Sequence, residues 1–305
     1  MNRGFVSFVG AGPGDPELIT LKGLRRLREA EVVLHDRLIP LPLLDEVSQG
    51  ATIIDVGKAP GRPCVGQGHI NWLLVDWARQ RKRIVRLKGG DPAVFGRLGE
   101  EIEAVRSAGI AFEVVPGVTA ATAAAARLGI SLTERGSASM IVFATGSDQT
   151  GHLPATLDWD VLARAEGTLV FYMPVGGLDS ITASLTSLGR DPREPAILVE
   201  HAGGAGERVI AGRLGEIADE ARAASVGPPA VLITGPTVAL ASVPLLCGDR
   251  GQVAGAVNGG AARARARDGL ATPYLSGIVW KSPDRLPPPG NTAGSAVGRR
   301  AGSRA

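Results

Sequence analysis

The sequence contains few of the residues that form disulfides or bind metals. It has only two cysteines in 305 residues, Cys64 and Cys247, too few for a disulfide framework and without CxxC spacing. The histidines show no metal-ligand spacing; there are four of them, His35, His69, His152 and His201. We therefore expect a protein of the reducing cytoplasm without a metal site.

Long apolar runs are also missing. No window approaches the roughly 18 consecutive apolar residues of a membrane span. The apolar residues 5–9 run directly into a glycine-rich stretch without a signal-peptide cleavage pattern. We expect no membrane partner and no signal peptide. With 44% hydrophobic residues, the chain is long enough for two domains that each bury a core.

The positive charge is concentrated at the C-terminal end. Residues 248–305 contain nine Lys/Arg and three Asp, a net charge of +6, which leaves −3 for residues 1–247. The same 58 residues hold 11 Gly and 11 Ala, a composition that cannot bury enough apolar surface to offset its ordering entropy. We predict a disordered basic tail, and we do not expect a nucleic-acid partner.

Strand-like and helix-like patterns alternate along residues 1–247. The first half predicts an α/β unit with a mostly parallel sheet, and ligands of such sheets lie beyond the carboxyl ends of the strands. Five loops should gather at that edge: residues 10–15, 35–37, 58–68, 89–92 and 116–120. Residues 140–235 predict a second α/β unit with a hairpin near residue 208. We expect domains at 1–116 and 117–247, followed by the tail at 248–305.

The first predicted helix follows the glycine-rich loop at residues 10–15. Asp15 is placed as its N-cap and Pro16 as its first residue, with leucines from Leu18 to Leu27 on one apolar face. The loop has the spacing GxGxG, whereas the dinucleotide fingerprint requires G-x-G-x-x-G. We therefore do not expect a nicotinamide or flavin site.

The most informative stretch is IVRLKGGDPAVFGR at residues 84–97. Gly89 and Gly90 permit positive φ and a close approach of the backbone to a ligand, Asp91 adds a carboxylate, and Pro92 stiffens the exit. From these residues alone, a ligand-binding loop and a plain strand-to-helix turn both remain open.

The order of motifs resembles that of the tetrapyrrole methylase family over about residues 4–240. The matching motifs are VGAGPGDPELITLKGL, VVLHDRLI, VGK, RLKGGDPAVFGR with EE, VVPGVTAA, GISLT and TLVFYM. The resemblance implies two α/β domains with S-adenosylmethionine (SAM) bound in the cleft between them, usually in a homodimer. By position it implies cofactor contacts at Pro13, Gly89, Gly90, Asp91, Val94, Thr119, Ala120, Met173 and Ala202.

The resemblance also implies a reaction and the residues that perform it. The reaction is SAM-dependent methylation of uroporphyrinogen III at carbons 2 and 7, which gives precorrin-2 by way of precorrin-1 for sirohaem or cobalamin. Asp36 resembles the family's proposed base and Lys58 its proposed proton donor; a loop salt bridge is the alternative for both. The substrate's eight carboxylates could pair with arginines, which are otherwise ordinary solvated side chains; these are Arg37, Arg62, Arg97 and Arg135.

Several positions depart from the family pattern. Leu98 replaces a glycine, Glu134 and Ser147 each replace a histidine, and His201 replaces an asparagine. Glu134 would be unfavourable beside a polyanionic substrate if its side chain pointed inward. Two alternatives therefore stay open: a methyltransferase for another corrinoid precursor, and a paralogue that binds the cofactor without turnover.

Overall fold

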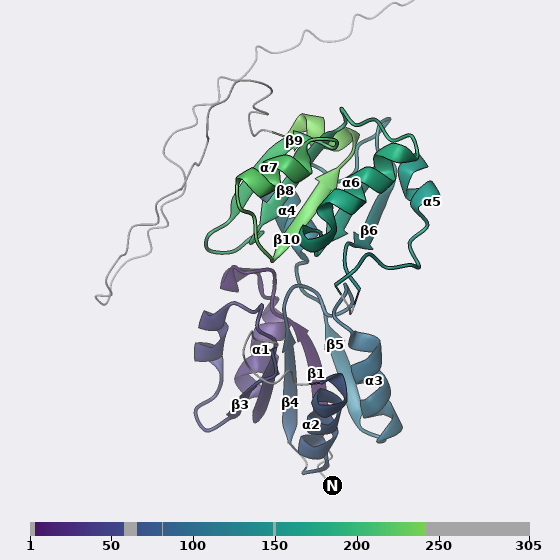
Figure 1. Ribbon diagram of the computed structural model, residues 1–305. Helices are drawn as coiled ribbons and strands as arrows, with labels where there is room; N and C mark the ends of the chain where they lie inside the picture. Colours follow the sequence, from purple (N-terminus) through teal and green to yellow (C-terminus); the bar gives the residue numbers. More distant parts are fainter. Residues whose placement is uncertain (1–3, 58–65, 81, 149–150, 242–305) are drawn as a thin grey trace, which may run out of the picture. The chain divides into compact units, whose positions relative to one another are not determined.

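The computed structural model describes residues 4–57, 66–80, 82–148 and 151–241 (Figure 1). The described residues form two five-stranded sheets and the helices that connect their strands. The strands are β1 Phe5–Gly10, β2 Val32–His35, β3 Thr52–Asp55, β4 Arg83–Lys88, β5 Ala111–Val115, β6 Ile141–Thr145, β7 Thr168–Tyr172, β8 Pro195–Glu200, β9 Arg208–Arg213 and β10 Ala230–Thr234. The α-helices are α1 Leu21–Glu29, α2 Gln67–Arg79, α3 Leu98–Ser107, α4 Ala120–Leu128, α5 Trp159–Arg164, α6 Leu178–Ser187 and α7 Ile217–Ala223. The 3-10 helices are η1 Pro16–Leu18, η2 Leu41–Glu46, η3 Val175–Gly177 and η4 Pro236–Leu240.

The first sheet is parallel throughout, with strand order β3-β2-β4-β1-β5. Apolar side chains of α2 and α3 pack on one face and those of α1 and η2 on the other. Because all five strands run the same way, their carboxyl ends meet at one edge, and the loops that follow β1, β2, β4 and β5 gather there as predicted. Residues 58–65 of the loop after β3 lie outside the described residues, as does the predicted tail.

The second sheet is mixed, with strand order β6-β7-β10-β8-β9. Only β6 and β7 pair in parallel, while β10 pairs antiparallel with both β7 and β8. The predicted hairpin is confirmed, since β8 and β9 pair antiparallel from Pro195↔Arg213 to Glu200↔Arg208. Helices α5, α6 and α7 cover one face and α4 the other, so this sheet is also buried on both sides (Figure 1).

The prediction of a single helix from Pro16 onward is wrong. Asp15 accepts a hydrogen bond from the backbone N–H of Glu17 at 2.8 Å, but it caps only the short helix η1. Thr20 then takes an extended conformation, and its Oγ1 accepts from the N–H of Gly23 at 3.0 Å, which makes Thr20 the N-cap of α1. The new start changes which leucines face the core, and Leu21 is 82% exposed.

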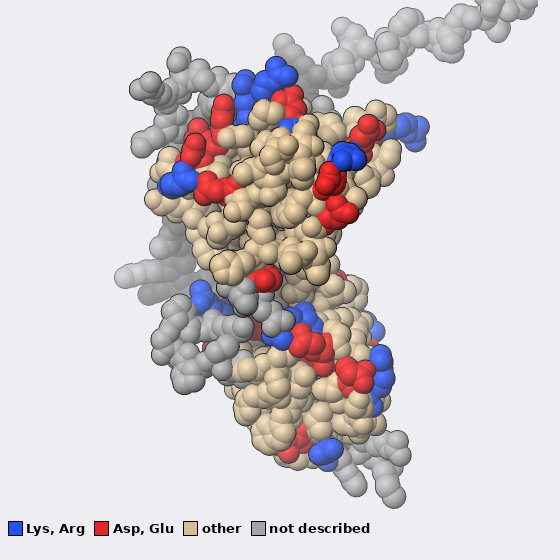
Figure 2. All heavy atoms as spheres, turned by 45° about the vertical axis from the view of Figure 1, so that its right-hand side comes forward, with Lys and Arg blue, Asp and Glu red and all other residues tan. Residues whose placement is uncertain are grey.

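Most charged side chains on the face shown in Figure 2 lie near a side chain of opposite sign. Exposed ion pairs of the structure include Arg164–Asp160, Arg193–Asp191 and Arg222–Asp219. Among the described residues, no helix has the length and apolar character needed to cross a membrane.

Candidate active site

Three glycine-containing loops meet backbone to backbone at the carboxyl edge of the first sheet. Gly90 N–H donates to Gly12 O at 2.8 Å, and Gly12 N–H donates back to Gly90 O at 3.3 Å. A Cβ at Gly10 would lie 2.6 Å from Cα of Gly117, and a Cβ at Gly117 would lie 2.3 Å from O of Gly90. Side chains at these positions would force the loops apart, so glycine fixes the loops after β1, β4 and β5 as one unit.

Asp91 ties two of these loops together. One carboxylate oxygen accepts from the N–H of Ala93 at 2.7 Å and the other from the N–H of Gly117 at 2.9 Å. Hydrogen bonds to a charged acceptor are among the stronger ones in proteins. The carboxylate that the sequence assigned to the cofactor therefore first organises the backbone around it, and direct contact with the cofactor stays a prediction.

The surface beside these loops combines accessible backbone with exposed apolar side chains. Gly90 has φ +66°, and the nearest atoms to a Cβ placed there would be 4.0 Å away, so its backbone faces open space. Met173 is 47% exposed and Phe95 41% exposed, and both have positive φ near 50°. Left-handed conformations of bulky residues cost energy and concentrate at functional sites. This surface suits a ligand with a flat ring and a polar part.

Tyr172, at the end of β7, connects the loops of the two sheets. Its hydroxyl lies 2.6 Å from Oγ1 of Thr119 and accepts from the N–H of Ala121 at 3.3 Å. The ring centroids of Tyr172 and Phe95 are 5.0 Å apart. Burial raises the pKa of Tyr172, so its hydroxyl keeps the proton at neutral pH. The sequence identified Thr119 but missed Tyr172, which is the last residue of a largely apolar strand.

Contacts bring together predicted cofactor residues from distant parts of the chain. Val94 and Ala120 pack on the apolar cluster that contains buried Ala202. Pro13 lies against Gly203, since a Cβ on Gly203 would be 2.9 Å from its Cγ. Together with the neighbouring glycine loop and Met173, these residues form a candidate cradle of backbone groups and apolar side chains, which suits a ligand with a nucleoside and an amino-acid group. The residues present therefore fit SAM.

The predicted base Asp36 belongs to a network of buried charges. Arg86, only 2% exposed, donates to the carboxylate of Asp36 and, at 3.1 Å, to Oε1 of Glu101. Lys88 donates to both oxygens of Glu101 at 3.0 and 2.9 Å. Burial and then the neighbouring Arg86 charge lower the pKa of Lys88, while Glu101 opposes the shift. The salt bridge considered for Asp36 is present, yet its side chain stays 32% exposed toward the loop edge.

Sequence reasoning did not predict this network, although a signal was present. In β4, Ile84, Arg86 and Lys88 alternate with Val85 and Leu87, so the two cations share one face of the strand. Two cations on a buried face require an acidic partner, and α3 supplies it.

The predicted substrate-binding arginines differ in their surroundings. Arg97 holds both oxygens of Glu100 through two hydrogen bonds of 2.7 and 2.8 Å. Arg37 and Arg135 are exposed, as is Glu134, whose N–H and O bond to Ala138. Arg62, like the predicted proton donor Lys58, lies outside the described residues. Arg37, Arg97 and Arg135 are thus all exposed, and Glu100 is the acidic partner of Arg97.

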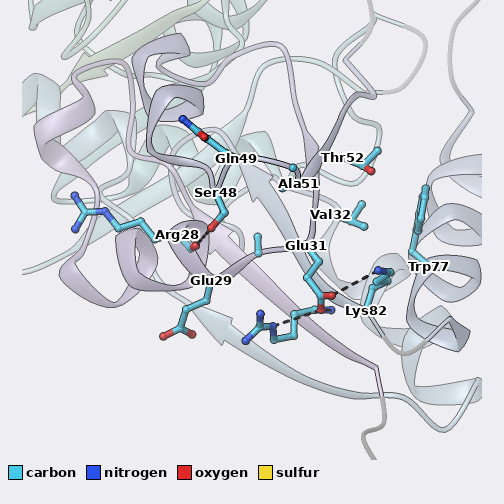
Figure 3. A pocket seen from close by; sticks show the side chains of 13 residues that line it. Arg28, Glu29, Glu31, Val32, Ser48, Gln49, Ala51, Thr52, Trp77 and Lys82 are labelled. Atoms are coloured by element: carbon cyan, nitrogen blue, oxygen red, sulfur yellow. Dashed lines mark hydrogen bonds and ion pairs between the residues drawn. The ribbon is translucent and has the colours of Figure 1, made fainter.

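A pocket of about 360 Å³ lies at the opposite, amino-terminal edge of the first sheet (Figure 3). It is lined by residues at the starts of β2, β3 and β4, including Val32, Thr52 and Arg83. Glu31 forms ion pairs with Lys82 and Arg83 there, at 3.6 and 3.5 Å. The pocket therefore lies away from the glycine loops. Among the described residues, no group of three or more His, Cys, Asp or Glu could hold a metal ion.

The family model for tetrapyrrole (corrin/porphyrin) methylases matches residues 6–218. The chain belongs to this family. The siroheme synthase of Edwardsiella ictaluri is 46% identical over 241 residues, which are 79% of this chain and 51% of that protein. The chain thus spans about half the length of the curated relatives it matches.

Two solved structures are similar to this fold. The uroporphyrin-III C-methyl transferase of Thermus thermophilus, complexed with S-adenyl homocysteine, is 43% identical with a TM-score of 0.68, covering 78% of this chain and all of that one. A cobalt precorrin-4 methyltransferase is 26% identical with a TM-score of 0.69, covering 77% of this chain and 95% of that one. The predicted fold class is confirmed, and the domain boundaries at residues 116 and 247 stay predictions.

Proposed function

We propose that this tetrapyrrole methylase transfers methyl groups from SAM to carbons 2 and 7 of uroporphyrinogen III, giving precorrin-2 by way of precorrin-1. The observation that carries the proposal is the 43% identity to the Thermus uroporphyrin-III C-methyl transferase over that enzyme's whole length. The glycine loops, Asp91 and the exposed apolar side chains at the same edge support it.

The methyl donor is proposed to lie against the cradle formed by the loops of both sheets. The backbone of Gly90 approaches it without an intervening Cβ, and Gly89 lets the same loop pack on Leu38, since a Cβ there would lie 2.4 Å from O of Leu38. Met173 covers one side with a flexible, polarizable side chain. Pro13, Val94, Thr119, Ala120 and Ala202 complete the cradle. When bound, SAM supplies the methyl group as an electrophile.

The protein's own task is to position the substrate and to accept a proton. A pyrrole carbon is itself the nucleophile, so the reaction requires no serine or cysteine. Orientation of substrate and donor supplies much of the barrier lowering. Asp36, partly exposed beside the loops and held by Arg86, serves as the general base, and Lys58 serves as the proton donor.

The substrate carboxylates are proposed to pair with arginines around this edge. Arg37 and Arg135 are exposed, and Arg97 would exchange its bidentate contact with Glu100 for a substrate carboxylate. Arg62 would contribute from the loop after β3.

We also propose that the enzyme works as a homodimer in the cytoplasm. Edge strand β6 exposes Ile141 and Phe143, and apolar side chains on an edge strand favour association. Light scattering at several concentrations tests this, because a mass of one chain at every concentration would contradict it.

A turnover assay tests the reaction. The full chain is incubated with uroporphyrinogen III and methyl-labelled SAM under reducing conditions, and the product spectrum distinguishes one methylation from two. We expect label in precorrin-2 and a 10²–10⁴-fold lower kcat for Asp36→Ala. SAM binding without transfer would instead identify a non-catalytic paralogue, and transfer to a different corrinoid precursor alone would identify the other alternative.

A further inference from the structure

Glu101 is the centre of the charge network beneath Asp36. Its side chain has no exposed surface, and its Oε1 accepts from Nε of Arg86 at 3.1 Å, Nζ of Lys88 at 3.0 Å and Nε2 of Gln67 at 3.2 Å. Its Oε2 accepts from Lys88 at 2.9 Å. Residues from α2, β4 and α3 thus converge on one buried carboxylate.

Arg86 connects this centre to the loop edge. Besides Glu101 and Asp36, its guanidinium donates to the carbonyls of Leu34 at 3.4 Å and Leu87 at 3.3 Å. Four bonds in fixed directions leave a planar guanidinium little freedom to turn. The N–H of Asp36 also donates to Leu87 O at 3.1 Å, so both ends of this contact are held against β4.

The charges of the four ionised side chains sum to zero, and of these side chains only Asp36 is appreciably exposed. Arg86 and Lys88 carry two positive charges, and Glu101 and Asp36 carry two negative ones. The first three are almost completely buried, whereas Asp36 is 32% exposed. A buried charge without a partner is costly, so the loss of Glu101 would leave two cations competing for the single carboxylate of Asp36.

We propose that Glu101 is a positioning residue for methyl transfer, which acts through Arg86 to fix the carboxylate of Asp36. The inference rests on the proposed function, in which Asp36 is the base. Without Glu101, Lys88 loses its acceptor and Arg86 loses one of its two anionic partners. Asp36 is then drawn toward the buried cations, and small displacements of a reacting group have large effects on rate.

The test begins with Glu101→Gln, which preserves the shape of the side chain. We expect kcat to fall 10- to 100-fold, while the Kd for SAM measured by calorimetry changes less than threefold, because the glycine loops are untouched. Glu113→Gln is the matched control. Glu113 is also a largely buried carboxylate with two cationic partners, Lys22 and Arg26, but it is not in contact with Asp36. Its kcat should stay at the wild-type value.

A double-mutant cycle separates positioning from general loss of structure. In an Asp36→Ala background, Glu101→Gln should change kcat less than twofold, because the group that Glu101 positions is absent. Lys88→Met combined with Glu101→Gln restores the charge balance and should recover kcat to within about fivefold of wild type. Any one of three results would overturn the proposal. These are an unchanged kcat in Glu101→Gln, multiplicative effects of Asp36→Ala and Glu101→Gln on kcat, and no recovery of kcat when Lys88→Met is combined with Glu101→Gln.

A crystal structure of Glu101→Gln separates this inference from the proposed function. If the wild-type protein does not methylate uroporphyrinogen III, the proposed function fails, and the position of Asp36 decides the inference alone. A displaced Asp36 carboxylate in Glu101→Gln supports the positioning role. An unmoved Asp36 carboxylate overturns it.

Discussion

Arg86 and Arg190 are both buried arginines that share their donors between a glutamate and backbone carbonyls. Arg190 bonds Glu194 at 2.7 Å and the carbonyls of Leu162 and Ala165 at 3.2 and 3.1 Å. Thr234 also donates to Glu194 at 2.8 Å, so this network closes among the elements of the second sheet. The network around Arg86 instead continues to Asp36 at the loop edge. Both networks are therefore buried and paired. The network of Arg190 is structural, whereas the network of Arg86 is linked to the site through the partly exposed carboxylate of Asp36.

Replacing each arginine by methionine is the most disruptive test of this comparison. Arg190→Met and Arg86→Met should each lower the free energy of unfolding by about 3–5 kcal/mol, because Glu194 loses its cationic partner in the first variant, and Glu101 and Asp36 lose Arg86 in the second. Urea unfolding measures this loss, and turnover at a temperature where both variants are folded measures kcat. Only Arg86→Met should reduce kcat. Equal kcat values for the two variants would contradict the distinction.

Glu113 provides a third charged cluster, whose contribution should appear as a pH dependence. Burial raises its pKa, but hydrogen bonds from Arg26, Lys22 and Ser7 outweigh this and lower the pKa to about 2. The stabilisation is therefore fully present above the unfolded value of 4.5 and is lost as the pH falls toward 2. The shift corresponds to about 3 kcal/mol at most.

Urea unfolding of the wild type and Glu113→Gln between pH 6 and pH 2 measures this contribution. The stability difference between the two proteins should shrink steadily below pH 4.5 and almost vanish near pH 2. A difference independent of pH would show that packing, and not ionisation, accounts for the role of Glu113.

Asp91 shows how a carboxylate can serve the site by holding its loops. Asp91→Ala removes the acceptor of the Ala93 and Gly117 N–H groups and should weaken SAM binding by about 1–2 kcal/mol, or roughly 5- to 30-fold in Kd. Asp158→Ala is the control, because Asp158 accepts from the N–H of Val161 as the N-cap of α5. Calorimetry should find unchanged SAM affinity in the control. An equal loss of SAM affinity in Asp91→Ala and Asp158→Ala would contradict a specific role of Asp91 in holding the site.

Sequence periodicity predicted the strands and the loop edge because both depend on residues close together in the chain. The contacts that define the site depend on residues far apart. Period two places Arg86 and Lys88 on one face of β4, but only the docking of α3 brings Glu101 to that face. The link from Thr119 to Tyr172 likewise depends on the docking of α4 on the second sheet. Competing local signals also matter. The leucine spacing favoured one helix from residue 16, whereas Thr20 caps a helix that begins at Leu21.

The smallest expected effect concerns Arg97, the cation that lies just beyond the glycine loop. Its bidentate partner Glu100 is half exposed, so removing the pair by Glu100→Ala should change the free energy of unfolding by less than about 0.5 kcal/mol. The released guanidinium would then be available to a substrate carboxylate, and the KM for uroporphyrinogen III should fall two- to threefold with kcat unchanged. Glu103→Ala, which breaks the neighbouring exposed pair with Arg106, should leave KM unaltered. A rise in KM for Glu100→Ala would mean that Glu100 holds Arg97 in the position that binds the substrate. This exposed pair would then be linked to the site, like the network of Arg86, and would differ from the structural network of Arg190.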